Sequence, residues 1–253
     1  MSVKLYAMTC GWMSVKASVF LEGAEGRLAI PVPCYLIDHP KGKVVFDTGL
    51  NHAVQHDAHA RIGNLAKAFA IEFHPGEELA ARLSLVDTDP ADIRYLVNSH
   101  LHFDHAGGND AVPNAQLVVQ RREWDAGQDP DLAHANGFDK KDFDLGHDLL
   151  APDGEHDLFG DGSVTCVPTY GHTPGHQSLR VKLDSGDVLL TGDACYLRET
   201  LESLRLPRVV HDREEMLRSL HAIRALRDAG VRIFYGHDAE FWKGVPQAPV
   251  AIA

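Results

Sequence analysis

The strongest constraint on the fold is an apolar run that ends in a cluster of ionisable side chains. Residues 95–97 are apolar, and they lead through Asn98-Ser99 into His100-Leu101-His102-Phe103-Asp104-His105. A short apolar run of this kind is typical of a buried strand. Ionisable side chains gathered where such a strand ends are costly without a partner. The cluster therefore predicts a metal site at the edge of a sheet.

The spacing within the cluster indicates two metal ions. Alternate side chains of an extended chain share a face, so His100 and His102 can bind one ion together. Asp104 and His105 are neighbours, and they can face a common ion only where the chain turns. Ala106-Gly107-Gly108 supplies that turn, because glycine adopts the backbone angles of a tight bend. Four side chains cannot complete two coordination spheres, so further ligands are expected later in the chain.

Three later positions repeat the arrangement of an apolar run followed by an ionisable residue. His172, Asp193 and His237 each lie beside a glycine, a few residues after a short run of β-type residues. Loops at one edge of a sheet are common positions for binding residues. We therefore expect all three to join the cluster.

Taken together, these motifs resemble the metallo-β-lactamase superfamily and, within it, the N-acyl homoserine lactonases. The similarity is carried by Asn98-Ser99-His100-Leu101-His102-Phe103-Asp104-His105-Ala106-Gly107-Gly108, Gly171-His172-Thr173-Pro174-Gly175-His176-Gln177-Ser178, Asp193-Ala194-Cys195-Tyr196 and Gly236-His237-Asp238, with further matches at residues 3–6, 31–36 and 46–49. It covers nearly the whole chain. The first motif identifies only the superfamily, whereas the tyrosine three places after Asp193 and the Pro-Gly-His-Gln-Ser run narrow it to the lactonases.

The resemblance implies a centre of two divalent metal ions, with two triplets of ligands and one bridging residue. In that order the ligands are His100, His102 and His172; Asp104, His105 and His237; and Asp193. Imidazole and carboxylate ligands without a thiolate suit zinc, and iron, manganese and cobalt are alternatives. Water held between two such ions loses its proton near neutral pH. The nucleophile is then a metal-bridging hydroxide, and no Ser-His-Asp triad is required.

The function implied by the resemblance is hydrolysis of the lactone ring of N-acyl homoserine lactones, which is quorum quenching. Tyr196 and one metal would stabilise the oxyanion, and Asp104 would pass a proton to the leaving ring oxygen. Three alternatives stay open. They are hydrolysis of another lactone such as 4-pyridoxolactone, cleavage of a thioester as in glyoxalase II, and lactone binding without turnover.

Composition is compatible with an enzyme that acts on a small neutral substrate. The chain has 253 residues and a net charge of −12, which disfavours nucleic acid and anionic membranes as partners. No stretch approaches the roughly 18 apolar residues of a membrane span, and the N-terminus lacks the form of a signal peptide. The four cysteines show no paired spacing, which indicates reduced, buried thiols in a cytoplasmic protein.

Strand-like runs alternate with helical patterns, and no linker, repeat or low-complexity tract interrupts them. We expect strands at residues 3–8, 32–37, 43–47, 95–99, 117–120, 163–167, 179–183, 188–191 and 232–235. The clearest helical pattern covers residues 213–229. The alternation favours one α/β domain over residues 1–253, with stacked sheets covered by helices on both outer faces. The resemblance implies the same architecture, a four-layer αββα sandwich.

Two apolar segments are candidates for a substrate pocket. One lies at residues 12–13, in a predicted glycine-containing loop, and the other is a stripe at near-helical spacing through residues 62–73. Comparable segments in related lactonases help to form the acyl-chain pocket. The candidate pocket residues are Met13, Phe69, Phe73 and Phe103. Core packing and a homodimer contact explain the same stripe equally well. Residues 139–156 are acidic and irregular, which predicts a solvated loop.

Overall fold

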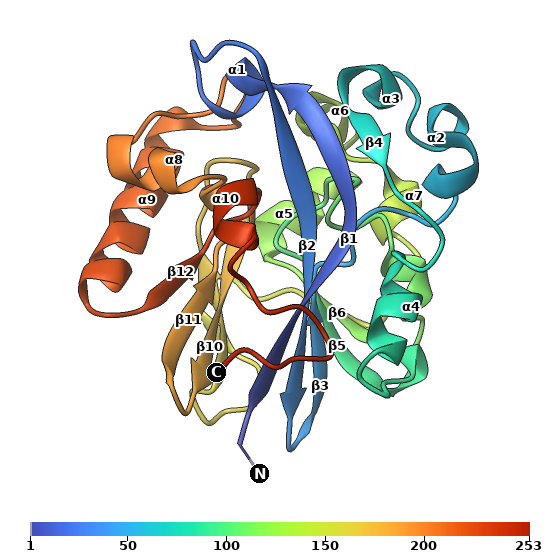
Figure 1. Ribbon diagram of the computed structural model, residues 1–253, viewed down its shortest axis with the longest axis vertical. Helices are drawn as coiled ribbons and strands as arrows, with labels where there is room; N and C mark the ends of the chain where they lie inside the picture. The colour runs from blue at the N-terminus through green and yellow to red at the C-terminus, as the bar shows by residue number, and fades with distance from the viewer. Residues whose placement is uncertain (1) are drawn as a thin grey trace.

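The computed structural model describes residues 2–253 and contains two β-sheets packed face to face (Figure 1). The larger sheet consists, in spatial order, of β4 (Ala70–Glu72), β1 (Lys4–Lys16), β2 (Arg27–His39), β3 (Gly42–Phe46), β5 (Ile93–Val97), β6 (Gln116–Val118) and β7 (Leu149–Leu150). The smaller sheet consists of β12 (Arg232–Phe234), β11 (Gly186–Leu190), β10 (Gln177–Leu183), β9 (Val164–Pro168) and β8 (His156–Asp157).

Parallel pairing brings the ends of distant strands to one edge of the sandwich. In the larger sheet β3 pairs in parallel with β5, with Phe46 opposite Val97. In the smaller sheet β11 pairs in parallel with β12, with Leu190 opposite Phe234. Parallel neighbours point the same way, so the segments that follow these four strands leave the sheets side by side. Those segments include three of the four sequence motifs that contain predicted metal ligands.

The main core lies between the two sheets, and alternation along the strands decides which residues face it. Along β2, Tyr35 and Ile37 pack against the smaller sheet, whereas Cys34 and Leu36 face the opposite way, towards helices. Successive side chains of a strand point to opposite faces. Both faces of β2 are buried, and this explains why it is apolar at nearly every position.

Helices cover both outer faces of the sandwich, which makes it four layers deep. The helices α8 (Arg198–Ser203) and α9 (Arg213–Asp228) lie on the side of the smaller sheet, and α4 (Leu79–Ser84) and α5 (Arg121–Gln128) lie on the side of the larger one (Figure 1). The predicted αββα sandwich is confirmed. The remaining helices are α1 (Ala17–Phe20), α2 (Val54–Ile62), α3 (Leu65–Ala68), α6 (Pro130–Asn136), α7 (Lys140–Phe143) and α10 (Ala239–Trp242).

All nine predicted strands coincide with strands of the structure, but β1 continues well beyond the predicted end. The loop expected at residues 12–13 is wrong. Gly11 has a φ of 102° and lies in a β-bulge, after which Trp12 pairs with Pro31 and Met13 with Ile30. A glycine inside a strand pattern marks a bulge as readily as a loop. Met13 is therefore a strand residue, and it is buried in the core.

The near-helical stripe through residues 62–73 does not form one helix. Gly63, with a φ of 58°, ends α2, and only the short α3 follows it. The chain then becomes extended in β4, which pairs antiparallel with β1 and places Ile71 opposite Met13. Pairing with a neighbouring strand overrode the local spacing of apolar residues.

The acidic segment 139–156 is not a solvated loop throughout. It contains α7, in which Asp142 and Phe143 are only 2% and 1% exposed. The Asp142 carboxylate pairs with the guanidinium of Arg61 on α2. The acidic composition did not indicate this short buried helix, because the sequence does not distinguish a buried carboxylate that has a cationic partner from a solvated one.

The four cysteines are buried, and none forms a disulfide bond within residues 2–253, as the sequence predicts. Over the same residues, no helix has both the length and the apolar character needed to cross a bilayer.

Candidate metal centre

The seven predicted ligands converge at the edge of the sandwich where the parallel strands end. The loop after β5 contributes four of them, and the segments after β9, β11 and β12 contribute one each. Six of the seven are less than 10% exposed, and His102 is half-buried. Side chains from four separate segments thus meet in one enclosed cluster.

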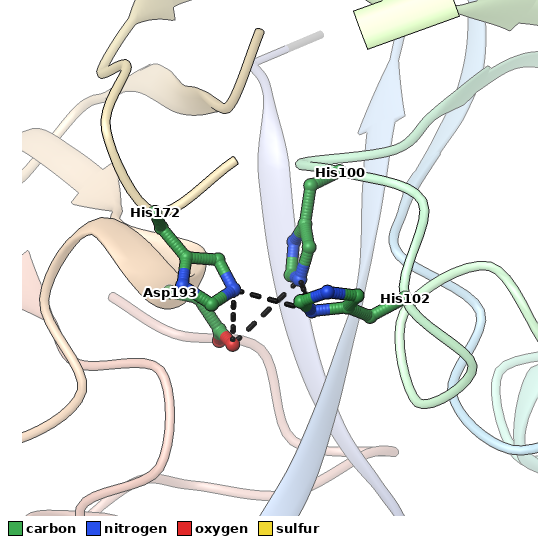
Figure 2. A group of neighbouring side chains, drawn as sticks. All are labelled: His100, His102, His172 and Asp193. Atoms are coloured by element: carbon green, nitrogen blue, oxygen red, sulfur yellow. Dashed lines mark hydrogen bonds and ion pairs between the residues drawn. The ribbon is translucent and has the colours of Figure 1, made fainter. Parts of the chain in front are cut away.

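One group of ligand atoms comprises three imidazoles and one carboxylate oxygen (Figure 2). His102 Nδ1 lies 2.8 Å from His100 Nε2 and 3.2 Å from His172 Nε2. Asp193 Oδ2 lies 3.3 Å from His172 Nε2 and 3.7 Å from His100 Nε2. Three nitrogens and one oxygen that converge in this way match the tetrahedral ligand set of zinc.

A second group lies against the other oxygen of the same aspartate. Asp193 Oδ1 is 3.2 Å from His105 Nε2 and 3.1 Å from His237 Nε2. Asp104 Oδ2 is 3.6 Å from His105 Nε2 and 3.7 Å from His237 Nε2. Asp193 therefore directs one oxygen to each group, which is the arrangement of a bridging carboxylate.

Three atoms of the second group show that a cation fits between them. His105 Nε2, His237 Nε2 and Asp193 Oδ1 are buried and have no hydrogen-bond partner among residues 2–253. Leaving a buried polar atom unsatisfied costs about 1–3 kcal/mol. Three such atoms directed at one point suit a divalent metal ion, which would coordinate all of them at once.

Hydrogen bonds at the far side of the imidazole rings set which nitrogen can bind a metal. His237 Nδ1 donates to the carbonyl oxygen of Pro31 at 2.8 Å, and His102 Nε2 donates to that of Asn136 at 2.7 Å. A ring nitrogen that carries a proton leaves the other nitrogen with a lone pair. In both residues the lone pair points into the cluster, as metal-binding histidines require.

Asp47 plays the same part for His105, although the sequence analysis assigned it no role. Its carboxylate accepts from His105 Nδ1 at 2.8 Å and from the backbone N–H and hydroxyl of Ser99 at 2.7 and 2.8 Å. Asp47 follows β3 and precedes Thr48-Gly49. This is the pattern of apolar run, ionisable residue and glycine that identified the other positions, so the same reasoning would have found it.

Burial and local charge set the protonation of the cluster. Burial lowers the pKa of His100 and His172 well below the usual range, so both imidazoles are neutral and keep a lone pair. Burial also opposes protonation of His105, but nearby carboxylates, Asp193 foremost, outweigh it and raise the pKa of His105. The pKa of Asp193 is lowered despite its burial, chiefly by His105 and His237. The Asp193 carboxylate is therefore ionised.

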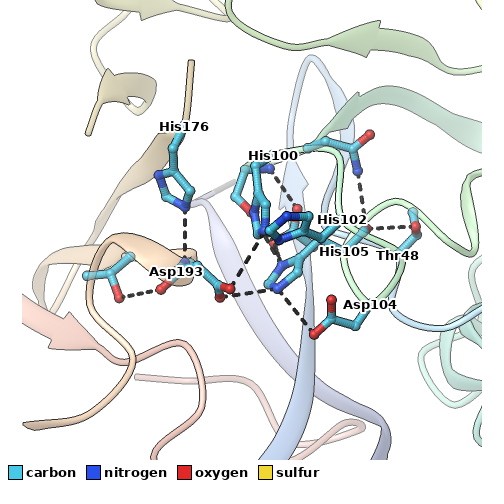
Figure 3. Close-up of polar contacts among 12 residues, drawn as sticks. Thr48, His100, His102, Asp104, His105, His176 and Asp193 are labelled. Atoms are coloured by element: carbon cyan, nitrogen blue, oxygen red, sulfur yellow. Dashed lines mark hydrogen bonds and ion pairs between the residues drawn. The ribbon is translucent and has the colours of Figure 1, made fainter. Parts of the chain in front are cut away.

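His176 contacts the backbone of Asp193. Its Nε2 accepts from the backbone N–H of Asp193 at 3.0 Å (Figure 3), and its Nδ1 donates to the hydroxyl of Thr169 at 2.9 Å. The imidazole is fully buried. His176 therefore positions the Asp193 backbone and is not itself among the converging ligand atoms.

His176 should make the stability of the metal-free protein depend on pH. Burial lowers the pKa of its imidazole from 6.5 to about 3. Its contribution to stability is therefore complete above about pH 6.5 and is lost as the pH falls towards 3, because the unfolded chain binds the extra proton. Below about pH 6 the free energy of unfolding should fall more steeply than in His176→Gln, by ~1.4 kcal/mol per pH unit. Urea unfolding of the chelator-treated proteins measures both slopes, and equal slopes would contradict this expectation.

Tyr196 lies beside the first group of ligands. Its hydroxyl oxygen is 3.3 Å from His172 Nδ1, and its ring packs edge-on against Phe20 of α1 at 4.3 Å. Because His172 directs Nε2 into the cluster, its Nδ1 carries the proton and donates to the tyrosine oxygen. Burial raises the pKa of Tyr196 well above its usual value. The phenol therefore keeps its proton and has it available for a further acceptor.

A pocket of about 570 Å³ opens beside the cluster. The predicted ligands His102, Asp104, His172, Asp193 and His237 line it together with Tyr196. Of the four candidate pocket residues, Phe69 and Phe103 also line it, with their rings 5.6 Å apart. Met13 and Phe73 do not; both are buried in the core cluster behind the pocket. The side of a strand on which a residue falls depends on its pairing register, which the sequence spacing did not reveal.

Most of the remaining pocket wall was not anticipated. It consists largely of apolar side chains: Val19, Phe20, Leu65, Leu132, Val209 and Val210. Leu65, Leu132 and Val209 belong to the few large apolar residues that are exposed on the described chain, at 37%, 42% and 72%. They come from three separate segments, so no local pattern in the sequence connects them. The pocket thus has an apolar wall that continues to an apolar rim.

Comparison with known proteins places the chain in a family. The metallo-beta-lactamase superfamily model matches residues 28–237. The chain is 35% identical to the N-acyl homoserine lactonase AttM of Azorhizobium caulinodans, over 98% of this chain and 97% of the relative. It is 32% identical to the N-acyl homoserine lactonase of Bacillus cereus, over 97% of each.

Solved structures agree with the sequence comparison. An N-acyl homoserine lactone hydrolase with the product N-hexanoyl-L-homoserine bound at its catalytic metal centre superposes with a TM-score of 0.88, at 30% identity and over 100% of both chains. The converging histidines and aspartates, the two-sheet sandwich and the full-length similarity lead to one conclusion. The chain belongs to the metallo-β-lactamase superfamily and, within it, to the N-acyl homoserine lactonase family.

Proposed function

We propose that this protein is a two-metal hydrolase that opens the lactone ring of N-acyl homoserine lactones and thereby destroys quorum-sensing signals. The observation that carries the proposal is the position of the ligand cluster and Tyr196 at the wall of an apolar pocket. Such a site offers a polar centre for an ester group and an apolar surface for an acyl chain. Relatives over nearly the full chain length bear the same activity in their names.

In this proposal the two groups of ligands each hold one divalent ion, and Asp193 is shared. Zinc fits the ligands best, because both groups combine imidazole with carboxylate and contain no thiolate. When bound, two such ions polarise an ester carbonyl and lower the pKa of a water molecule towards neutrality.

Tyr196 is the residue that stabilises negative charge on the substrate. Its phenol stays protonated, and because it accepts a hydrogen bond from His172 it can donate its own proton to another group. A donor already directed into the pocket can bind the carbonyl oxygen of the lactone as charge develops there. This stabilisation needs no reorganisation of the side chain.

Asp104 is the proposed proton carrier for the leaving ring oxygen. Of the four predicted ligands in the loop after β5, two line the described pocket, His102 and Asp104, and Asp104 is the one that carries a carboxylate. Its carboxylate therefore faces both the ligand cluster and the pocket in which the substrate would bind. A group within hydrogen-bond reach of the leaving oxygen can deliver the proton that completes ring opening.

The apolar wall of the pocket is the proposed binding surface for the acyl chain. Phe20, Phe69 and Phe103 lie near the ligand cluster, and Leu65 and Leu132 extend the surface to the rim. Apolar surface buried by a ligand contributes in proportion to its area. A substrate with a long acyl chain should therefore gain more from this wall than one with a short chain.

Phe69→Ala should lower kcat/KM for a decanoyl homoserine lactone by about 10-fold, which corresponds to about 1.4 kcal/mol. The effect on a butanoyl homoserine lactone should be smaller, because a short chain leaves the rim uncovered. Leu145→Ala provides a control, since Leu145 is exposed but does not line the pocket. Initial rates with both substrates give the two kcat/KM values. An equal fall in kcat/KM for both substrates would show that Phe69 does not contribute to recognition of the acyl chain.

The proposed function is tested by a hydrolysis screen of homoserine lactones with different acyl chains, alongside 4-pyridoxolactone and glutathione thioesters. Metal content is measured on the same sample, because two ions per chain are expected. We expect ring opening of the homoserine lactones by the metal-loaded protein and loss of turnover after chelation. Turnover of the thioesters with none of the homoserine lactones would overturn the proposal in favour of a glyoxalase-type enzyme.

We further propose that the chain acts as one domain in a reducing compartment such as the cytoplasm. The ligands come from both halves of the sandwich, so neither sheet could form the centre alone. The four buried thiols are in keeping with a reducing environment.

A further inference from the structure

We infer that Glu123 is a positioning residue that ties together the two loops bearing the three histidine ligands of one metal ion. Glu123 lies in the first turn of α5 and is completely buried. None of the predicted ligands comes from this helix. The inference rests on the proposed two-metal centre, and it concerns a residue that would touch neither metal nor substrate.

Each carboxylate oxygen of Glu123 accepts a hydrogen bond from a different loop. Oε1 accepts from the backbone N–H of Leu101 at 3.2 Å, and Oε2 accepts from that of Gly175 at 2.7 Å. Leu101 stands between His100 and His102 in the chain, so its N–H group belongs to the backbone that carries both. The second bond holds the loop that begins after β9.

The loop after β9 approaches α5 too closely for any residue but glycine at position 175. A Cβ atom on Gly175 would lie 2.2 Å from the backbone nitrogen of Glu123. Real Cβ atoms do not approach backbone atoms so closely, so the loop rests directly on the first turn of the helix. His172, three residues earlier, is thereby held at a set distance from the helix that also holds Leu101.

A purely structural role explains these contacts less well. Glutamate at the third position of a helix often bonds back to the N-cap residue in a capping box. In this protein the N-cap is Gln120, and the carboxylate of Glu123 turns instead to the two loops. Burial raises the pKa of Glu123 from 4.5 to about 7. A group that is costly to bury is used here where two loop N–H groups need an acceptor.

Glu123→Gln separates the two contacts with almost no change in shape. The amide offers one oxygen and one NH2 group, so one of the two loop N–H groups loses its acceptor and faces a donor. We expect that loop to shift, and with it the imidazoles of one ligand group. Zinc affinity of that group should fall by about 10-fold to 100-fold, as is typical when the support of metal ligands is removed.

The experiment measures zinc release by a competing chelator and amide hydrogen exchange by NMR. In Glu123→Gln, one of the two zinc ions should be lost at a lower chelator concentration than in the wild type. Asp142→Asn is the matched control, because Asp142, like Glu123, is a buried carboxylate. Asp142 pairs with Arg61 and is not part of the ligand cluster. It should lower the melting temperature and leave zinc affinity unchanged.

Amide exchange in the metal-free wild type provides a test that does not depend on a variant folding. The N–H groups of Leu101 and Gly175 should exchange as slowly as those in the centre of β10. Wild-type zinc affinity in Glu123→Gln, or fast exchange at both amides, would overturn the inference. Neither measurement uses a substrate. If the protein bound two zinc ions but did not hydrolyse homoserine lactones, that result would contradict the proposed function and not the role of Glu123.

Discussion

Replacing Asp193 with Asn is expected to release at least one of the two metal ions and to lower kcat/KM by about 10³-fold or more. Asp193 is the only residue whose two oxygens lie against both groups of ligand atoms in the described structure. Asparagine keeps one acceptor oxygen but replaces the other with an NH2 group, which cannot bind a cation. Metal ions contribute several kcal/mol to transition-state stabilisation, and about 4 kcal/mol corresponds to about 10³-fold in rate.

The measurement combines metal content per chain with rates of homoserine lactone hydrolysis. Asp187→Asn is the matched control, because Asp187 lies near the start of β11, the strand that precedes Asp193, and pairs with Arg180. The control should bind two ions and turn over normally. If Asp193→Asn also retained two ions and the wild-type rate, Asp193 would not be a bridging ligand.

Tyr196→Phe is expected to lower kcat by about 10²-fold to 10³-fold, the usual effect of removing one donor to a developing oxyanion. Metal content should not change, because the substitution leaves all seven converging histidines and aspartates in place. The ring would still pack against Phe20, so the loss should come from the missing hydroxyl alone. KM should change little, since the donor binds most strongly to charge that is present only in the transition state.

A second tyrosine separates this effect from a general loss of stability. Tyr95→Phe removes the hydroxyl of a buried tyrosine that packs against Phe159, in the core and outside the pocket. It should leave kcat unchanged. Wild-type kcat in Tyr196→Phe with metals retained would exclude the phenol from the mechanism and leave the metal ions as the sole source of charge stabilisation.

The elements of the fold and the members of the cluster could be predicted because both depend on local pattern. Nine strands and the helix α9 were located from apolar runs and periodicity, since a buried strand or helix face requires them. The seven clustered residues share one signal, an ionisable side chain just beyond a strand end. Parallel pairing of β3 with β5 and of β11 with β12 then brings most of those ends together.

The predictions that were wrong concern residues whose environment depends on a partner distant in the sequence. Met13 and Phe73 have the composition of pocket residues, but pairing of β1 with β2 and β4 directs Met13 into the core and places Phe73 over Gly11. The acidic composition around Asp142 predicted a solvated side chain, whereas the folded chain buries its carboxylate against Arg61. In each case the neighbour that decided the environment lies far away in the sequence.

By itself the sequence therefore determined the chemistry, namely which imidazoles and carboxylates stand at strand ends and that they suit two divalent ions. Only the tertiary structure decided the surroundings: the apolar rim of Leu65, Leu132 and Val209, and the two loops that meet on Glu123. The physical reason is the separation in sequence of the residues that interact. Periodicity and turn chemistry act between residues close in the chain, whereas a pocket wall or a shared hydrogen-bond acceptor exists only once strand register and helix packing have brought distant segments together.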